Sequence, residues 1–419
     1  MRWRARSIGG AVTAPDVAEP VVDALGLPLI SCAPKLIYGG GALPDELAGS
    51  GSAGEIIEPA SYGMEPISSL FGSSHYRWRI TPQTFVVDDV FSGMIAEFYG
   101  QRPYPEAPVS ALVRMRDVTL IGGVLYAHAG GPTSIIYETC RHIDRDVVWM
   151  APAEKIRAAD RKMFSLQGWR SFYLGSAGSF NYGHWLVDDL PRLKGIFHMM
   201  TADPGPIRVV IESFGTEIDR VRIDSIRTLL AQQIHVDIVA RHEAYHFSTL
   251  YYPTPISEHP VVKSPIALDF LARRALETVG LEQAAQGGGR RVFVDRSVAH
   301  GRSLINGDAV RSLMASHGFA IINPEGMSFA EQVRLFAGAS IVVGQMGAAM
   351  TNTLFCRPTT TTLYLAPAGW IEPFYFDLAM TRGHEYQVLY GPVGDPEVPP
   401  HQSDFSVSIQ ALAAWLEAL

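Results

Sequence analysis

Short apolar runs alternate with amphipathic helical segments along the chain from about residue 170 to its end. Turn residues bound the runs, and the segments between them place apolar side chains at helical spacing. The predicted strands are 171–176, 207–213, 235–240, 248–253, 291–295, 319–323, 340–344 and 361–365. The predicted helices are 184–200, 224–233, 265–280, 307–318, 329–337 and 347–355. Strand–helix alternation with short connections predicts parallel sheets with right-handed crossovers, in two α/β units that face one another across a cleft.

Residues that favour helix ends support two of these helices. Ser264 followed by Pro265 is typical of an N-cap and a first turn, and Gly280 suits the C-terminal stop. Ser328 and Glu331 have the S-x-x-E spacing of a capping box. These signals predict helices that begin directly after each serine.

The first 165 residues have a different pattern. Residues 1–60 are rich in Gly, Ala and Pro, so we expect a loop-rich N-terminal extension. A β-rich lead-in follows, with strands and hairpins predicted at 84–91, 118–130 and 134–142. We divide the chain into the extension (1–60), an N-terminal α/β domain with the lead-in (61–259), a C-terminal Rossmann-like domain (260–395) and a C-terminal helical segment (396–419). We expect the final helix to pack back on the first domain.

The composition is that of an ordinary globular protein, and its main use is to exclude a disordered chain and a nucleic-acid-binding protein. The 419 residues are 47% apolar and 18% charged, far from the composition of disordered chains. The 34 basic and 42 acidic residues give a net charge of −8. No basic surface for nucleic acid is therefore expected.

The spacing of the cysteines and the length of the apolar runs indicate the cellular compartment in which we expect the protein. Cys32, Cys140 and Cys356 are widely separated, whereas disulfide frameworks and zinc ribbons need paired short spacings. No apolar run reaches the roughly 18–20 residues that span a bilayer. The basic start before Asp16 has too short an apolar stretch for a signal peptide. We expect a cytoplasmic protein with reduced thiols, and peripheral association with the inner membrane stays open.

The densest polar cluster of the chain reads NYGHWLVDDLPRL. If this segment is helical, Asn181, His184, Asp188 and Arg192 lie on one face, opposite an apolar stripe. His184 and Asp188 are four residues apart and can hydrogen-bond, which raises the basicity of the imidazole and sets its tautomer. Pro191 predicts a kink or a later helix start. The alternative is an exposed helix face with an ordinary stripe of charges.

A second cluster, GQMGAAMTN, follows directly after the predicted strand 340–344. Gly344 and Gly347, at a strand-to-helix turn, would let backbone N–H groups of the helix start meet an anion such as a diphosphate. The pattern is not G-x-G-x-x-G, and no Asp or Glu follows at the distance that would hold a dinucleotide ribose. The lysine of a P-loop is also missing. The alternative is that both glycines only allow a tight turn and close packing of helix on sheet.

A third cluster follows the predicted strand 291–295, at the same carboxyl edge. Arg296 and Arg302 flank this loop, and two guanidiniums near a helix N-terminus could clamp a diphosphate. The alternative is a surface loop with solvated charges. Asn306 fits an N-cap as well as it fits a ligand.

The sequence has no metal-ligand spacing such as H-E-x-x-H or a ladder of Cys and His. Asp188 and Asp189 are adjacent carboxylates of a kind that can hold Mg²⁺ beside a diphosphate, but such pairs are common by chance. We therefore expect no metal site and no cofactor, and Mg²⁺ is not expected to be essential.

In this order the three clusters resemble glycosyltransferase family 61. The first is similar to that family's N-[YF]-x-H-[WF]-L-x-[DE]-x-L-P-R-L segment, and SFAEQVRLFAGASIVVGQMGAAMTNTLF is similar to its C-terminal half. The resemblance covers about residues 170–390. It implies a GT-B-like fold of two Rossmann-like domains. It also implies that a sugar passes, with inversion, from a nucleotide-sugar donor to a hydroxyl of a saccharide acceptor, in polysaccharide or glycan biosynthesis.

The resemblance also implies roles for single residues. Asn181 and Arg192 would lie on the acceptor side, and either His184 or Asp188 would be the catalytic base. Donor-binding positions would be Arg296, Arg302, Asn306, Gly344, Gly347, Ala348, Thr351 and Asn352. The arginines and the backbone N–H groups near Gly347 would stabilise the departing diphosphate.

Four positions depart from the family's pattern and leave other functions open. Ala349 replaces a Gly, and Gly307 replaces a Glu after Asn306. Met346 stands where the family usually has His, and Tyr364 stands where an acidic residue often follows the strand. A non-catalytic carbohydrate- or nucleotide-binding protein could keep the fold with these residues. A transferase that moves a non-sugar group onto a glycan is a further alternative.

Overall fold

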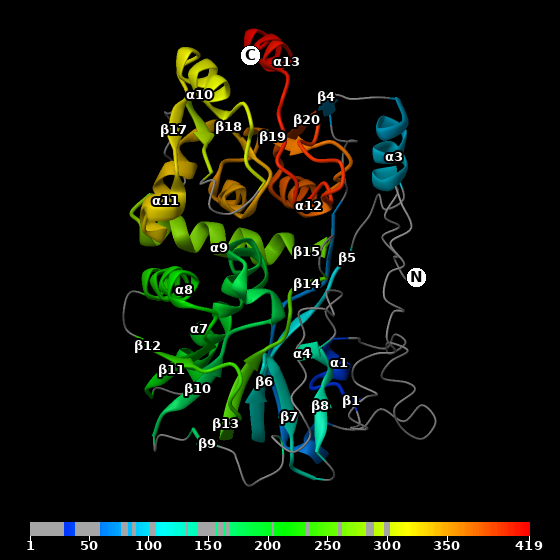
Figure 1. Cartoon of the computed structure of the whole chain (residues 1–419). Coiled ribbons are helices and arrows are strands. Elements are labelled where there is room, and N and C mark those ends of the chain that lie inside the picture. Colours follow the sequence, from blue (N-terminus) through cyan, green and yellow to red (C-terminus); the bar gives the residue numbers. More distant parts are fainter. Residues whose placement is uncertain are drawn as a thin grey trace.

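The computed structural model shows an α/β protein with two large sheets (Figure 1). The residues it describes are 29–37, 59–76, 83–85, 89–100, 106–130, 133–140, 156, 162–164, 168–202, 205–230, 234–258, 262–281, 289–296 and 302–419. Most of the predicted extension over residues 1–60 lies outside these ranges, so its structure stays a prediction.

The first sheet is mixed. Its order is β1-β8-β7-β6-β13-β10-β11-β12, with β2 beside β6 and β9 beside β13. The strands are β1 (Leu29–Ile30), β2 (Met64–Phe71), β6 (Ser110–Ile121), β7 (Val124–Ala127), β8 (Ser134–Ile136), β9 (Lys162–Met163), β10 (Arg170–Tyr173), β11 (Ile207–Glu212), β12 (His235–Val239) and β13 (Tyr245–Pro253). The strands β10, β11 and β12 are parallel neighbours, as the alternation predicts. β13 is antiparallel to β6, so the sheet as a whole is not parallel.

The predicted lead-in supplies the antiparallel part of this sheet. Gly122 and Gly123 connect β6 to β7 with positive φ angles of 64° and 84°. A two-residue loop with φ > 0 at both positions matches the twist of a hairpin, which favours glycine there. The hairpin predicted within 118–130 is therefore confirmed.

The second sheet is parallel throughout its described strands, in the order β17-β16-β18-β19-β20-β4. The strands are β16 (Arg290–Val294), β17 (Ala320–Ile322), β18 (Ala339–Gln345), β19 (Thr361–Pro367), β20 (Glu385–Gly391) and β4 (Gln83–Phe85). β4 comes from the lead-in that we assigned to the first domain, yet it pairs with β20. Two small ladders join β14 (Ser257–Glu258) to β15 (Val262–Lys263) and β3 (Ser74–His75) to β5 (Glu106–Ala107).

Helix α9 (Pro265–Thr278) lies between the two sheets (Figure 1). The Ser264 hydroxyl accepts the N–H of Ala267, and Glu331 and Ser328 form the predicted capping box at α11 (Phe329–Ala337). Both predicted helix starts are thus confirmed. The other helices are α1 (Pro34–Ile37), α3 (Asp89–Gly100), α4 (Tyr137–Cys140), α6 (Tyr182–His184), α7 (Lys194–Ala202), α8 (Thr216–Leu229), α10 (Gly307–Ser316), α12 (Pro373–Arg382) and α13 (Ile409–Glu417).

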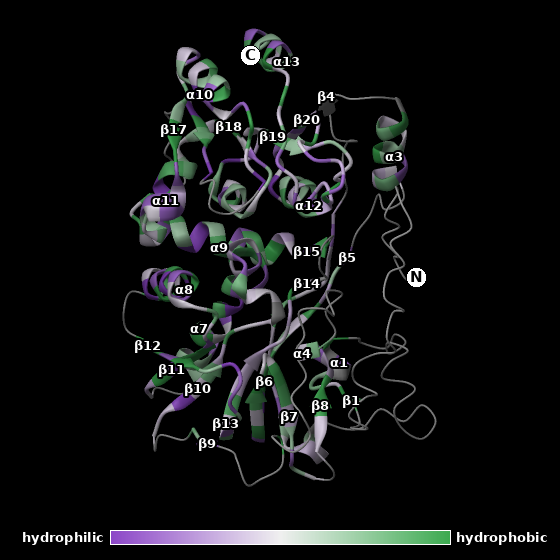
Figure 2. Ribbon diagram, viewed as in Figure 1, coloured by the Kyte–Doolittle hydropathy of each residue, from purple (hydrophilic) through white to green (hydrophobic). Residues whose placement is uncertain are grey.

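One apolar cluster joins the two sheets. Its buried members come from both halves of the chain and include Leu186, Val209, Leu268, Val342 and Phe374. Because these side chains pack on one another, each sheet helps to position the other. Strands β6 and β7, which Figure 2 shows as largely hydrophobic, contribute mainly to separate clusters within the first sheet.

Several predicted elements differ in type or extent from those in the structure. Residues 84 and 85 of the predicted strand 84–91 belong to β4, and α3 begins at Asp89, because Phe91, Ile95 and Tyr99 recur at a spacing of four and bury one helical face. The predicted strand 134–142 gives way to α4 after Ile136, and the predicted helix 224–233 is the end of α8, which begins at Thr216 and stops at Leu229. The predicted helix 347–355 is instead a 3₁₀-helix, η10 (Ala348–Phe355).

The final helix packs on the second sheet rather than on the first. The indole N–H of Trp415 in α13 donates to the side chain of Gln387 in β20. Leu412 and Leu416 are buried in the same cluster as Leu365. This location corrects our expectation that α13 returns to the first domain.

We predict that Gly344→Ala destabilises the protein by about 1–3 kcal/mol, the usual cost of overpacking a core. A Cβ atom at Gly344 would lie 2.6 Å from Sδ of Met350 and 2.9 Å from Cβ of Val294. The matched control is Gly326→Ala, because a Cβ there meets no atom within 4 Å. The free energy of unfolding, measured in urea, tests this, and equal values for the two variants would contradict it.

Candidate active site

The segment from Tyr182 to Ala202 is helical but changes its type three times. α6 is followed by a π-helical turn, η6 (Trp185–Asp189), a 3₁₀ turn, η7 (Leu190–Leu193), and α7. The break at Pro191 agrees with the predicted kink, because proline cannot donate the next helical hydrogen bond. Asn181 begins the segment as an N-cap, and its side chain accepts the N–H of Gly183 at 2.8 Å.

This segment is not the exposed stripe of charges that we considered as the alternative. Asp188 is 8% exposed and Arg192 is 1% exposed. Arg192 donates to the carbonyls of Gly175 and Pro253 and to the carboxylate of Asp189 at 2.7 Å. The predicted acceptor-side role of Arg192 therefore competes with a structural role that already uses its guanidinium.

His184 and Asp188 form the predicted pair, and a third residue, Ser257, hydrogen-bonds to Asp188. Nδ1 of His184 lies 2.8 Å from Oδ2 of Asp188, and the Ser257 hydroxyl donates to Oδ1 of Asp188 at 2.6 Å. Burial lowers the pKa of His184, but the hydrogen bond and the charge of Asp188 outweigh burial and raise the pKa above its ordinary value. Ser257, which sequence reasoning missed, orients the carboxylate.

The second half of the chain contributes an aromatic ring, that of Phe374, which packs against His184. The ring of Phe374, in α12, meets the imidazole edge-on, with 5.3 Å between the ring centroids. The buried Lys263 places its Nζ over the ring of Phe374, 4.0 Å from the ring centroid. Lys263 also pairs with the buried Asp377 at 3.4 Å, and the Tyr76 hydroxyl donates to the same carboxylate. The imidazole is thus packed at the junction of the two sheets.

Arg296 and Arg302 converge as predicted. A Cβ atom on Gly347 would lie 3.0 Å from Nη1 of Arg296 and 3.7 Å from Nη2 of Arg302, so both guanidiniums cover one face of this glycine. Burial lowers the pKa of both arginines, and the charge of Arg296 further lowers that of Arg302. Arg302 stacks on Trp370, with Cζ 4.5 Å from the ring centroid. An anion beside Gly347 would relieve this clustering of positive charge.

Glu372 is a site residue that the sequence analysis missed. Its carboxylate caps α12 by accepting the N–H of Phe374 at 2.9 Å. Burial raises the pKa of Glu372, and the N–H of Phe374 and nearby positive charges oppose that rise. These charges belong to Lys263, His184 and Arg302. The segment from Trp370 to Phe374 therefore connects the arginine pair to the imidazole, with Glu372 at its centre.

Two residues predicted to bind the donor, Asn352 and Thr351, contact the first motif within the protein. The hydroxyl of Tyr182 donates to Oδ1 of Asn352, and Nδ2 of Asn352 donates to Gln332, both at 2.7 Å. A Cβ on Gly183 would lie 2.8 Å from Oγ1 of the buried Thr351. The geometry thus gives Asn352 and Thr351 packing partners in the protein, and their contact with a donor stays a prediction.

Three further residues predicted to bind the donor, Gly344, Asn306 and Ala348, have different surroundings in the structure. Gly344 is in tight contact with its neighbours, which agrees with the packing alternative. The Asn306 side chain donates to the carbonyl of Val407 and accepts the N–H of the same residue. Asn306 therefore holds the segment that precedes α13 in place. Ala348 is half-buried at the first position of η10, beside the face of Gly347 that the arginines cover.

Two of the four departures from the family's pattern, Met346 and Tyr364, are in the core. Met346 is buried among apolar side chains, and Tyr364 is enclosed between the rings of Tyr375 and Tyr386. At these positions, the chain therefore presents no imidazole or carboxylate to the site.

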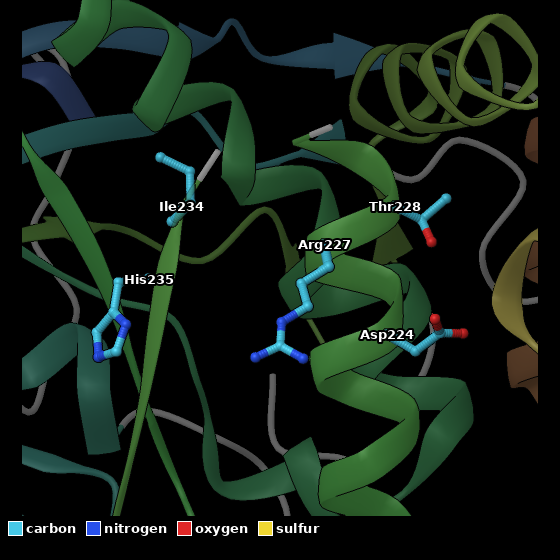
Figure 3. A pocket seen from close by; sticks show the side chains of 5 residues that line it. All are labelled: Asp224, Arg227, Thr228, Ile234 and His235. Carbon is cyan, nitrogen blue, oxygen red and sulfur yellow. The ribbon is translucent and has the colours of Figure 1, made fainter. Parts of the chain in front are cut away.

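A pocket of about 490 Å³ lies elsewhere, between α8 and the start of β12 (Figure 3). It is lined by Asp224, Arg227, Thr228, Ile234 and His235. This pocket is at the amino end of β12, whereas ligands of parallel α/β sheets bind at the carboxyl ends of the strands. Asp224 also accepts the N–H of Phe329 at 2.6 Å, which ties the pocket to α11. We therefore do not place the reaction here.

Within the described part of the chain, no three His, Cys, Asp or Glu side chains are grouped as metal ligands. The described helices include none with the length and apolar content of a membrane span. Neither finding tests whether the protein uses a metal ion or associates with a membrane surface.

One of the comparisons with known proteins, the match to a family model, supports the motif analysis. Residues 182–363 match the family model Glycosyltransferase 61, which confirms the predicted resemblance. No curated protein matches the chain. One similar solved structure is the E. coli heptosyltransferase WaaC with ADP-2-deoxy-2-fluoro heptose, at 13% identity over 54% of this chain and 93% of that chain, with a TM-score of 0.22. Another is the bacterial iron-containing dodecameric glycosyltransferase TibC from enterotoxigenic E. coli H10407, at 10% identity over 63% and 78%, with a TM-score of 0.23.

We predict that Arg192→Met destabilises the protein by about 3–5 kcal/mol, the usual loss when one partner of a buried ion pair is removed. Arg220→Met is the control, because its pair with Glu217 is exposed and should contribute about 0–1 kcal/mol. Urea unfolding compares the two variants. If Arg192→Met kept wild-type stability and lost only acceptor binding, the acceptor-side role would be the correct one.

Proposed function

Since residues 182–363 match the model of glycosyltransferase family 61, we propose that this protein transfers a sugar from a nucleotide-sugar donor to a hydroxyl of a saccharide acceptor. We further propose that transfer inverts the anomeric centre, on a GT-B-like frame whose second sheet holds the donor. The pathway would be polysaccharide or glycan biosynthesis. The observation that carries the proposal is the placement of a His–Asp pair and an arginine pair at the two ends of one short segment, 370–374.

An inverting displacement needs a base on one side of the anomeric carbon and positive charge on the other. The acceptor oxygen forms the new bond to the anomeric carbon as the bond to the diphosphate breaks. The acceptor proton moves to the base, and the electron pair leaves with the nucleoside diphosphate. General-base help of this kind contributes typically 10²–10⁴-fold to the rate.

We assign the base to His184 rather than to Asp188. Both carboxylate oxygens of Asp188 already have partners, since one meets His184 Nδ1 and the other accepts from Ser257. With Nδ1–H donated to Asp188, Nε2 is the nitrogen that accepts the acceptor's proton. Asp188 then orients the ring and stabilises the imidazolium that forms.

The departing diphosphate would lie beside Gly347. Arg296 and Arg302 cover this glycine, and the first N–H groups of η10 begin at Ala348. Guanidiniums and helix N-termini both stabilise phosphate charge. Because two arginines can balance the charge of a diphosphate, we propose that the transfer does not depend on a metal ion.

A non-catalytic binding protein is the competing proposal. It is favoured by the burial of Met346 in the core, because the family's usual imidazole is then missing from the donor side. Such a protein would bind a nucleoside diphosphate without turning over a nucleotide sugar. The two experiments below separate these functions.

We predict that nucleoside diphosphates stabilise the wild-type protein against heat and that Arg302→Ala weakens this binding by at least tenfold. Loss of a charge-assisted contact of about 1.5–3 kcal/mol accounts for that size. Arg290→Ala is the matched control, because this exposed arginine begins β16, the strand that Arg296 follows. Thermal shifts with UDP, GDP, ADP and CDP test the prediction. No stabilisation by any of them would refute the donor site.

We predict that His184→Ala and Asp188→Asn each keep the fold and lower the transfer rate by about 10²-fold or more. The wild-type rate should rise with pH as His184 loses its proton, with an inflection above the ordinary pKa of histidine. In Asp188→Asn the inflection should move to lower pH, because the carboxylate that raises the pKa of His184 is gone.

The readout is the pH profile of sugar transfer, with circular dichroism to confirm folding. His317→Ala, at the end of α10, serves as the control. Wild-type rates in both active-site variants would show that the base lies elsewhere. Nucleotide binding without any transfer, in the wild type, would favour the non-catalytic protein.

A further inference from the structure

Two phenylalanines lie at the carboxyl edge of the first sheet, close to His184. Phe180 ends the 3₁₀ turn η5 (Ala177–Phe180) after β10, and Phe214 follows β11 by two residues. Their ring centroids are 6.1 Å apart. Building on the proposed function, we infer that the pair forms a stacking platform for the sugar ring of the acceptor, next to the base.

Strand pairing accounts for the meeting of these residues. β10 and β11 are parallel, with Tyr173 opposite Val210, so the segments that leave their carboxyl ends emerge side by side. β12 is the next parallel strand, and Arg241 follows its end by two residues. The carboxyl edge is where parallel α/β sheets bind their ligands. Three neighbouring strands thus each direct one residue to the platform.

Phe180 is exposed although the protein buries most of its large aromatic side chains. The residue is 46% exposed, whereas Phe172 and Phe247 of the same sheet are fully buried. An exposed aromatic side chain gives up the stabilisation of burial, and its ring face remains available for packing by a ligand. Phe214 is half-buried and its ring plane is tilted by 51° from that of Phe180, so Phe214 supports the exposed ring, on which a sugar would stack.

The platform is held rigidly on both sides. The buried Ser179 hydroxyl donates to Asp189 at 2.7 Å directly before Phe180, and Asn181 caps α6 directly after it. The guanidinium carbons of Arg222 and Arg241 lie 5.2 and 4.9 Å from the ring centroid of Phe214. Cations over an aromatic ring fix its position. A fixed platform loses little conformational entropy when it binds a ligand.

The same turn touches the proposed base. A Cβ atom on Gly178 would lie only 3.1 Å from Cγ of His184, so the backbone of η5 is packed on the imidazole. A sugar ring on Phe180 would therefore lie at the edge of the reaction centre. The C–H groups of a sugar ring form an apolar face that packs on an aromatic ring, while its hydroxyls point sideways. This geometry suits an acceptor whose hydroxyl must reach His184.

The test compares Phe180→Ala, Phe180→Trp and Trp169→Ala in the full chain. Trp169 is the matched control, because it is 39% exposed and precedes the amino end of the same strand, β10. Binding to an array of immobilised glycans is measured first. We expect Phe180→Ala to bind the glycans that the wild type prefers about tenfold more weakly, the order of one aromatic stacking contact. Phe180→Trp should restore binding, and Trp169→Ala should not change it.

Kinetics with the best-bound glycan as acceptor supply a second readout. In Phe180→Ala, the KM for the acceptor should rise about tenfold, while the KM for the donor and kcat stay within about twofold. Wild-type acceptor affinity in Phe180→Ala, or an equal loss in Trp169→Ala, would overturn the platform. So would a wild-type protein that binds no glycan. Nucleoside diphosphate binding is independent of these results, so failure of the platform and failure of the proposed function are distinguishable.

Discussion

The structure depends on one close contact, where the turn Tyr182–His184 packs on the 3₁₀-helix η10. Gly183 has no Cβ, and any Cβ there would come within 2.8 Å of Oγ1 of Thr351. The buried Tyr182–Asn352–Gln332 hydrogen bonds hold the same contact. Both halves of the chain meet here, so this contact sets where the imidazole lies relative to the arginine pair. A satisfied buried network of this kind also specifies a unique arrangement, because any other leaves polar groups unpaired.

Charge is distributed unevenly around this contact. The chain has a net charge of −8, yet positive side chains are gathered near the site. Lys263 has a buried carboxylate partner in Asp377, while Arg302 rests on the ring of Trp370. Burial lowers the pKa of both arginines, because water solvates their charges less well there. A protein with a net negative charge thus has a local cluster of cations beside Gly347.

Local signals predicted the elements well, but they did not predict which polar residues are available to a ligand. The capping residues Ser264 and Ser328 and the His184–Asp188 bond needed only helical geometry. Asn306 and Arg192 looked like ligands in the sequence, yet their side chains bind backbone carbonyls of residues distant in the chain. Glu372 was missed for the converse reason, since nothing near it in the sequence shows that it faces cations from other elements.

The sequence by itself determined the alternation of strands and helices, the helix starts and the two motifs that resemble glycosyltransferase family 61. These features depend on spacing and chemistry within a few residues, which a sequence contains directly. The tertiary structure alone decided that β4 joins the second sheet, that α13 packs there, and that Ser257, Phe374 and Glu372 surround the imidazole. Such contacts join residues about 30 to 300 positions apart. Only packing against partners from the rest of the chain, with burial and satisfied hydrogen bonds, selects among them.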